Sequence, residues 1–332
     1  MGLHTPIEPP RPPQSFGAEI LDLRHFNSHH LRPLLEREGH VWARMMSWDY
    51  RASAEMILRY IDSKILPGYA AVYNDRIGGY AFFVYEGSKG VIGDLFADGS
   101  IPGADESIEH RLATHVIDTL QRSPGVQRIE AQLLLHESGD ISRPFLLEGF
   151  QQFPRLFMML PLRERTHPDP RVTHVPGFEF RRWAEQDFQA VAGVITTSYR
   201  GHIDSEINDQ YRSLNGSLRF LNNIVRFPGC GIFDSGASFV AVHRGTRSVA
   251  GLLLCSRVRD DVGHVTQVCV LPELRGRRIG ESLIALCTQE LRRRNFSALS
   301  LTVTEANLKA VDLYRRLGFH IRRRFDAFVW ES

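Results

Sequence analysis

Apolar residues follow two kinds of spacing along this chain, and the two kinds succeed one another in nearly the same order in both halves. In the first half, Leu31, Leu34 and Leu35 recur at helical spacing, and short β-branched and aromatic runs come after them. The expected helices are 18–62, 107–122 and 142–148, and the expected strands are 69–73, 79–85, 90–96, 126–135 and 153–162.

The second half repeats this order of elements. Its expected helices are 183–199, 217–224, 280–294 and 307–317, and its expected strands are 238–244, 248–258, 263–271, 298–303 and 320–330. The halves also end alike, with LLEGFQQFPRLFMML at 146–160 and LYRRLGFHIRRRFDAFV at 313–329. Self-similarity on this scale predicts two copies of one supersecondary plan.

Proline-rich segments mark where these copies begin and end. The chain has 332 residues, which is enough for two domains of ordinary size. We expect a flexible arm over 1–15, because this stretch is rich in proline. The segment RERTHPDPRVTHVPG at 163–177 has no apolar periodicity, so we expect a first domain over 16–165, a linker over 166–177 and a second domain over 178–332.

The composition is that of an ordinary globular protein, with 43% hydrophobic and 23% charged residues. The formal net charge of +2 hides an asymmetry: residues 1–165 carry 17 basic and 21 acidic side chains, and residues 166–332 carry 23 and 17. A compact anionic ligand would be drawn to the second half. The four cysteines lack metal-site spacing and no apolar run could span a membrane, so we expect a cytoplasmic protein with reduced thiols, no metal and no membrane contact.

The sharpest local signal is VCVLPELRGRRIGESLIAL at 268–286. A buried strand ends near Pro272, a turn rich in glycine and arginine follows, and an amphipathic helix begins near Gly280. This arrangement binds phosphate, because free N–H groups and the helix dipole face the anion. The alternative is a connecting loop with solvated arginines.

This motif resembles the acetyl-CoA pyrophosphate loop of the GNAT N-acetyltransferase superfamily, whose pattern of Arg or Gln, two residues, Gly, one residue, then Gly or Ala falls on Arg275, Arg278 and Gly280. Arg278 replaces the middle glycine. The resemblance implies an α/β fold of two tandem GNAT-like domains, each a mixed, mostly antiparallel twisted sheet flanked by helices. It also implies that acetyl-CoA is the co-substrate, held by Val268, Cys269, Val270, Arg275, Gly276, Arg277, Arg278, Ile279, Gly280 and Asn307.

A second motif, NLKAVDLYRRLGF at 307–319, resembles a later helix of the same family. There an Asn contacts the cofactor and a Tyr protonates the leaving thiolate, which implies these roles for Asn307 and Tyr314. A tyrosine suits the acid role, since its pKa near 10 keeps it protonated at neutral pH. The alternative is a core aromatic packed beside Leu313 and Leu317.

The general base is less evident. Many relatives place a carboxylate on the strand before the loop, but here that strand reads HVTQVCV. Gln267 can only hydrogen-bond, so a water chain or His264 is expected to accept the proton, unless His264 is a surface strand residue. One interpretation of Cys269 is a nucleophile that forms a covalent acyl-enzyme. The favoured interpretation is a small buried side chain that packs as an apolar group.

The acceptor pocket is expected at the polar stretch SYRGHIDSEINDQY, residues 198–211. Its candidate substrate residues are Tyr199, His202, Asp204, Glu206 and Tyr211, and its acids would attract a cationic amine. A solvated loop is the alternative. From the first half, Trp42, Trp48 and Asp49 could approach the same pocket, although core packing is the favoured role of both tryptophans.

The first half lacks the basic loop. Its equivalent stretch, GDLFADGSIPGADESIEHRL at 93–112, has no basic residue before Arg111 and would repel a pyrophosphate. We therefore expect a degenerate copy that shapes a wall of the acceptor site or stabilises the second domain.

The expected function is an N-acetyltransferase that moves an acetyl group from acetyl-CoA to a small-molecule or peptide amine by direct attack. A catalytically silent acyl-CoA-binding or regulatory module is the alternative. Nucleic-acid binding through Arg292–Arg294 and Arg322–Arg324 is a third class, disfavoured because neither cluster forms a continuous basic face with interleaved aromatics.

Overall fold

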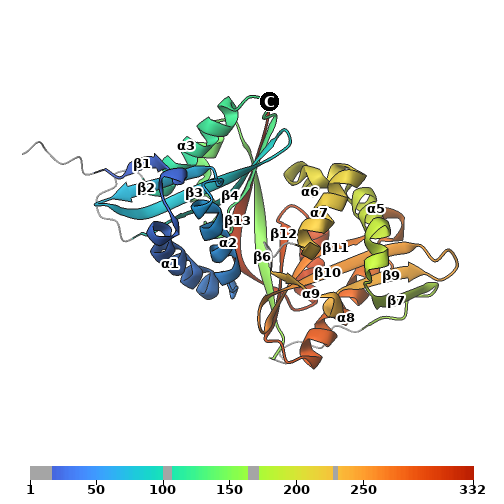
Figure 1. Ribbon diagram of the computed structural model, residues 1–332. Coiled ribbons are helices and arrows are strands. Elements are labelled where there is room, and N and C mark those ends of the chain that lie inside the picture. The colour runs from blue at the N-terminus through green and yellow to red at the C-terminus, as the bar shows by residue number, and fades with distance from the viewer. Residues whose placement is uncertain (1–16, 100–106, 164–171, 227–230) are drawn as a thin grey trace, which may run out of the picture.

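The computed structural model describes residues 17–99, 107–163, 172–226 and 231–332. The expected arm lies outside these residues, as do 166–171 of the expected linker. Figure 1 shows two lobes of helices packed on strands, which meet where β6 (Gln151–Pro161) and β13 (His320–Glu331) run through the middle of the molecule. Each of these two strands therefore lies where it can pair with strands of either lobe.

The first half builds its lobe from a helix pair, a meander of strands and a crossover helix. Its elements are β1 (Glu19–Asp22), α1 (Ser28–Met46), α2 (Arg51–Asp62), β2 (Gly68–Tyr73), β3 (Arg76–Glu86), β4 (Lys89–Ala97), α3 (Ile108–Arg122), β5 (Arg128–Gln132), α4 (Ser142–Leu147) and β6.

The second half follows the same plan with additional short elements. These are β7 (Phe178–Arg182), α5 (Phe188–Tyr199), α6 (Ile203–Ile207), α7 (Leu214–Arg226), β8 (Ile232–Phe233), β9 (Phe239–His243), β10 (Val249–Arg259), β11 (Val262–Val270), α8 (Ile279–Arg293), β12 (Ala298–Thr304), α9 (Leu308–Arg316) and β13.

Two of the expected helices are wrong at their N-terminal ends. The stretch 18–62 begins with strand β1, and its helical part is divided at Ser47, whose left-handed φ of 58° ends α1. The helix expected over 183–199 starts only at Phe188, and strand β7 precedes it. Both missed strands are short, so they carry too little alternation to show in the sequence.

The strands of the described residues form one sheet of 13 strands, in the order β1-β2-β3-β4-β5-β13-β6-β12-β11-β10-β9-β7, with β8 against β10. The last strand of each half is exchanged. β13 pairs antiparallel with β5 of the first half, β6 pairs antiparallel with β12 of the second, and β6 and β13 pair with each other. The sheet is thus continuous across the expected linker, and the domain boundaries stay a prediction.

Each exchanged strand contributes buried residues to the hydrophobic core of the other half. Phe328 of β13 is fully buried in the core of the first half, with its ring stacked 4.1 Å from that of Phe145 in α4. Met158 of β6 is fully buried in the core of the second half, together with Leu283 of α8. Each half therefore depends on the other for part of its hydrophobic core.

Among the described residues, no helix combines the length and the hydropathy that crossing a membrane requires.

The exchange predicts that a core mutation in β13 destabilises both lobes together. Phe328→Ala removes a fully buried aromatic ring, which costs about 3–5 kcal/mol of unfolding free energy. We expect urea unfolding of this variant, followed by tryptophan fluorescence and far-UV circular dichroism, to give a single transition shifted to lower urea. Two transitions, of which only one shifts, would contradict the exchange.

Candidate functional site

The second half of the sheet opens where β11 parts from its parallel neighbour β12. Their pairing ends at Val265–Leu301. At the same point β11 has a bulge at Thr266 in its ladder with β10, which bends the strand. The backbone groups of residues 267–270 therefore face the opening between the strands, where an extended ligand can pair with them.

The segment after β11 has the backbone of an anion-binding loop. Gly276 (φ 79°) and Arg278 (φ 63°) are both left-handed, and α8 starts directly after them. A Cβ on Gly276 would meet nothing within 4 Å, so its backbone is open to close approach. The first N–H groups of α8 and the exposed side chains of Arg277 and Arg278 add positive charge at this end of the helix.

Arg278 stands where the family pattern has its middle glycine, and it takes a conformation that glycine adopts at lower cost. The replacement therefore leaves the course of the loop compatible with the motif.

Arg275 connects this loop to the helices that face it. Its Nη2 donates to the carbonyl oxygen of Ser198 near the end of α5 over 2.7 Å, and its Nε donates to that of Val270 over 3.3 Å. Sequence reasoning assigns Arg275 a ligand contact alone. The structure gives it a further role, since it fixes the loop against the polar stretch 198–211.

Tyr314 lies on α9, buried and within electrostatic reach of two residues from other elements. Burial raises the pKa of its phenol well above the ordinary value, and Asp204 and Cys269 raise it further. The hydroxyl is therefore protonated at neutral pH and can serve as a proton donor. Asn307 caps the same helix, accepting from the N–H of Ala310 over 3.4 Å.

Four of the five candidate acceptor residues lie close together, and two of them, Tyr199 and Asp204, interact electrostatically with Tyr314. Tyr199 and Tyr211 stack with ring centroids 4.4 Å apart, and His202 meets Tyr199 edge-on at 5.3 Å. Asp204 accepts a hydrogen bond from the hydroxyl of Thr304 on β12.

The fifth, Glu206, lies apart from this group. Its carboxylate is exposed and forms an ion pair with Arg212 at 3.0 Å. The sequence predicts no helix here, so Glu206 is expected beside the other four candidates. The short helix α6 instead directs Glu206 away from Asp204. A salt-bridge role therefore accounts for its carboxylate.

Gln267 and Cys269 lie on β11 at the opening. The Tyr199 hydroxyl donates to Oε1 of Gln267 over 3.4 Å, while Nε2 of Gln267 is buried with no hydrogen-bond partner in the described part of the chain. Burial raises the pKa of the Cys269 thiol to about 12. A thiol with this pKa carries almost no thiolate at neutral pH, so its environment favours the packing role over the acyl-enzyme.

His264 lies in a different environment from the other candidate catalytic residues. Its ring is 4.9 Å from that of Trp48 in the first half, and its Nδ1 is 2.9 Å from Oγ of Ser300. Burial lowers its pKa to about 3. A base this weak holds a proton poorly at neutral pH, so the surroundings of His264 disfavour the general-base role.

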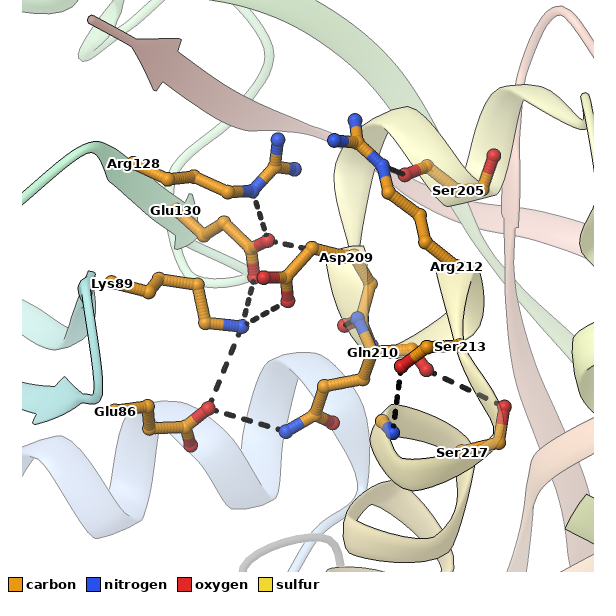
Figure 2. Close-up of polar contacts among 12 residues, drawn as sticks. Glu86, Lys89, Arg128, Glu130, Ser205, Asp209, Gln210, Arg212, Ser213 and Ser217 are labelled. Carbon is orange, nitrogen blue, oxygen red and sulfur yellow. Dashed lines mark hydrogen bonds and ion pairs between the residues drawn. The ribbon is translucent and has the colours of Figure 1, made fainter.

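The first half holds the acceptor stretch in place through a buried lysine. Lys89, at the start of β4, points its Nζ toward Asp209 and Glu130 (Figure 2); it lies 2.6 Å from the Asp209 carboxylate and 3.1 Å from that of Glu130. Glu86 lies 3.5 Å from the same Nζ and accepts a hydrogen bond from Gln210 over 3.2 Å. Burial alone would lower the pKa of Lys89, but these three carboxylates together raise it above the ordinary value.

Arg128 extends this network. Its Nε donates to Glu130 over 2.6 Å, its Nη2 donates to the backbone carbonyl of Glu206 over 2.5 Å, and its Nη1 pairs with Glu331 of β13. The first half thus contributes a polar clamp on α6 and the residues after it. The sequence predicts that the first half shapes the acceptor site or stabilises the second domain, but it does not predict these contacts.

The two arginine clusters are engaged in local ion pairs. Arg294 lies 2.7 Å from Asp234, and Arg323 lies 3.5 Å from Glu137. Such pairs neutralise charge that nucleic-acid phosphates would otherwise meet.

The second half of the chain matches a known protein family. Residues 203–319 match the model of the acetyltransferase (GNAT) family. A mycothiol acetyltransferase from Thermobifida fusca (strain YX) is 37% identical over 109 residues, which cover 30% of this chain and 31% of that protein. The alignment therefore spans less than a third of the length of this curated relative.

Solved structures resemble the chain over nearly its whole length. A GCN5-related N-acetyltransferase from Sphaerobacter thermophilus has a TM-score of 0.62 at 18% identity, covering 88% of this chain and 91% of its own. A tandem GNAT protein from the clavulanic acid biosynthesis pathway has a TM-score of 0.57 at 16% identity, covering 95% and 98%. At these identities the likeness shows the fold, which is the expected tandem arrangement.

The clamp predicts that Lys89→Met loosens the acceptor stretch. The change leaves Asp209 without its buried cation and removes one of the two cations that pair with Glu130, which costs about 3–5 kcal/mol. We expect faster amide hydrogen exchange over residues 203–212 than in the wild type, measured by mass spectrometry. Arg122→Met, which breaks an exposed pair with Asp118, is the control and should leave that exchange unchanged. Equal exchange in the two variants would refute the clamp.

The burial of His264 predicts a pH dependence of stability. Its folded pKa of about 3 lies below the ordinary value of 6.5, so the unfolded chain binds more protons between these values and stability falls as pH drops below 6.5. Relative to His264→Phe, the wild type should lose about 2 kcal/mol of unfolding free energy between neutral pH and about pH 5. Urea titrations at both pH values measure this difference, and parallel losses in the two proteins would show that His264 titrates normally.

Proposed function

The chain carries an acetyltransferase domain of the GNAT family in its second half, and on this premise we propose that it transfers an acetyl group from acetyl-CoA to a primary amine. The observation that carries the proposal is a convergence at the open end of β11. The unpaired strand edge, the glycine-arginine loop and Tyr314 come from three segments of the chain and meet around Cys269.

The donor site proposed here fits the shape and charge of a coenzyme A thioester. Gly276 and the first turn of α8 bind the pyrophosphate through backbone N–H groups, and Arg277 adds charge. The backbone of Val268–Val270 pairs with the pantetheine arm as an added strand would, and one of its N–H groups polarises the thioester carbonyl. Acetyl-CoA supplies the activated acetyl group.

Tyr314 acts as the general acid in this proposal. Its raised pKa keeps the phenolic proton in place until the thiolate leaves, and its position beside Cys269 places it close to the strand that holds the thioester. Asn307 serves by fixing the start of α9, since its side chain caps that helix. Its amide also lies 3.4 Å from the ring of His202, which links the donor and acceptor sides.

The acceptor enters between α5, α6 and the open end of β11. Asp204 attracts the ammonium form of the amine, and the stacked rings of Tyr199 and Tyr211 bind its apolar body. Gln267 orients the amine or a water molecule that receives its proton. His264 takes no part, because its ring packs against Trp48 and its pKa is about 3.

We also propose the division of labour that goes with this chemistry. The domain over 178–332 carries the reaction, and the domain over 16–165 holds the acceptor stretch through Lys89 and Arg128.

The proposal is tested by a thiol-release screen with acetyl-CoA and a library of amines. Tyr314→Phe should lower turnover about 10²–10⁴-fold with the accepted amine, because it removes the acid and keeps the ring. Acetyl-CoA affinity measured by calorimetry should stay within error of the wild type. Tyr85→Phe, which removes an exposed phenol in the first half, is the matched control.

Two outcomes would count against the enzyme. Full turnover by Tyr314→Phe would remove the tyrosine from the mechanism. Tight acetyl-CoA binding with no thiol release from any amine would identify a catalytically silent acyl-CoA-binding module instead.

A further inference from the structure

A cavity of about 510 Å³ lies between the two halves, on the side of the sheet covered by α1 and α2. Its walls come from both halves: Trp48 and Tyr50 from the segment between these helices, Asp94 from β4, and Val258 from β10. The two halves touch here, since the N–H of Asp49 donates to the carbonyl of Val258 over 2.8 Å. The volume is in the range of small-molecule sites.

The register of the sheet relates this cavity to the acceptor pocket of the second half. The pairing of β4 with β5 ends at Ile92–Ala131, just as that of β11 with β12 ends at Val265–Leu301. One residue later, each strand has a bulge, at Gly93 and at Thr266. The next residue is Asp94 in the first half and Gln267 in the second.

The hydrogen bonds of Asp94 and Gln267 show the same correspondence between the two halves. The hydroxyl of Tyr50, which follows α1, donates to Oδ2 of Asp94 over 2.6 Å. In the second half, Tyr199 at the end of α5 donates to Gln267 in the same way. The first half has therefore kept the acceptor-side arrangement and carries a carboxylate at the position where the second half has an amide.

Asp94 brings a negative charge to the cavity wall, and no cation of the described residues forms an ion pair with it. Two arginines, Arg257 and Arg259, also line the cavity; Arg259 pairs with Asp261 at 2.7 Å, and Arg257 forms no ion pair with Asp94.

A second carboxyl group, that of Glu38, lies beside Asp94. Glu38 is fully buried and accepts hydrogen bonds from Trp42 over 2.9 Å and from Tyr80 over 2.7 Å. Burial and the nearby Asp94 raise the pKa of Glu38 well above its ordinary value, which favours the neutral form of Glu38. A cationic ligand would be attracted to the Asp94 side of the cavity.

Aromatic rings complete the wall. Trp48 stacks on Trp42 with centroids 5.5 Å apart, and Trp42 stacks on Tyr50 at 5.4 Å. Aromatic faces beside a carboxylate bind ammonium groups through cation–π attraction and bind planar apolar bodies by stacking. The indole nitrogen of Trp48 is also buried without a hydrogen-bond partner among the residues described.

We propose that this cavity is a second ligand site, which binds a small primary amine with an aromatic body through Asp94, Trp48 and Tyr50. The first half has no basic loop to hold an acyl donor, so the amine is bound there without being acetylated. The site is independent of acetyl transfer in the second half.

Isothermal calorimetry with tryptamine and its neutral counterpart tryptophol tests the site, because the two probes differ in the ammonium group. Tryptamine should bind the wild type at least about tenfold more tightly than tryptophol. Asp94→Asn keeps an acceptor for Tyr50 and should reduce the affinity for tryptamine to that for tryptophol. Met56→Trp narrows the cavity without changing its charge and should weaken both probes. Thermal unfolding checks that each variant is folded.

Asp204→Asn is the matched control in the second half: it weakens amine binding at the acceptor pocket and should leave the tryptamine binding that depends on Asp94 unchanged. Equal affinity for the two probes would overturn the proposal. So would loss of tryptamine binding in Asp204→Asn with binding retained in Asp94→Asn, or no binding of tryptamine, tyramine or phenethylamine at millimolar concentration. Absence of thiol release in the transfer assay would leave this result intact, so the two proposals fail separately.

Discussion

The exchange of the last strands is the interaction on which the rest of the structure depends. β13 completes the sheet of the first half, β6 completes that of the second, and the two strands pair along the middle of the molecule. Because these two strands contribute buried aromatic and aliphatic side chains, neither lobe has a full hydrophobic core without the other. The orientation of the halves is thereby fixed by sheet hydrogen bonds and core packing together.

This fixed orientation places a β-hairpin of each half against the helices of the other. Glu86 and Lys89 of the first half reach Asp209 and Gln210 beside the acceptor stretch, as Figure 2 shows. Val258 of the second half reaches Asp49 beside the aromatic cavity in the reciprocal way. The relation is symmetric in geometry and unequal in chemistry, since the loop after β11 is rich in arginine and the loop after β4 is acidic.

Much of the fold could be predicted from the sequence because its signals are local. The periodicity of residues 263–271 and 280–294 and the glycine-arginine turn between them identify β11, α8 and the loop without any distant contact. The strand exchange could not be predicted, because β6 and β13 have similar patterns and either one satisfies the local requirements of β5. The contact of Lys89 with Asp209 joins residues far apart in sequence, and a lone lysine carries no local signal for it.

The central claim is that two copies of one fold are locked together while only the second binds the acyl donor. Calorimetric titration with acetyl-CoA tests this directly, because it counts the sites per chain. The account predicts one site, which is lost when Arg277→Ala and Arg278→Ala are combined in the loop before α8. Two sites per chain, or one site that survives this double change, would contradict it.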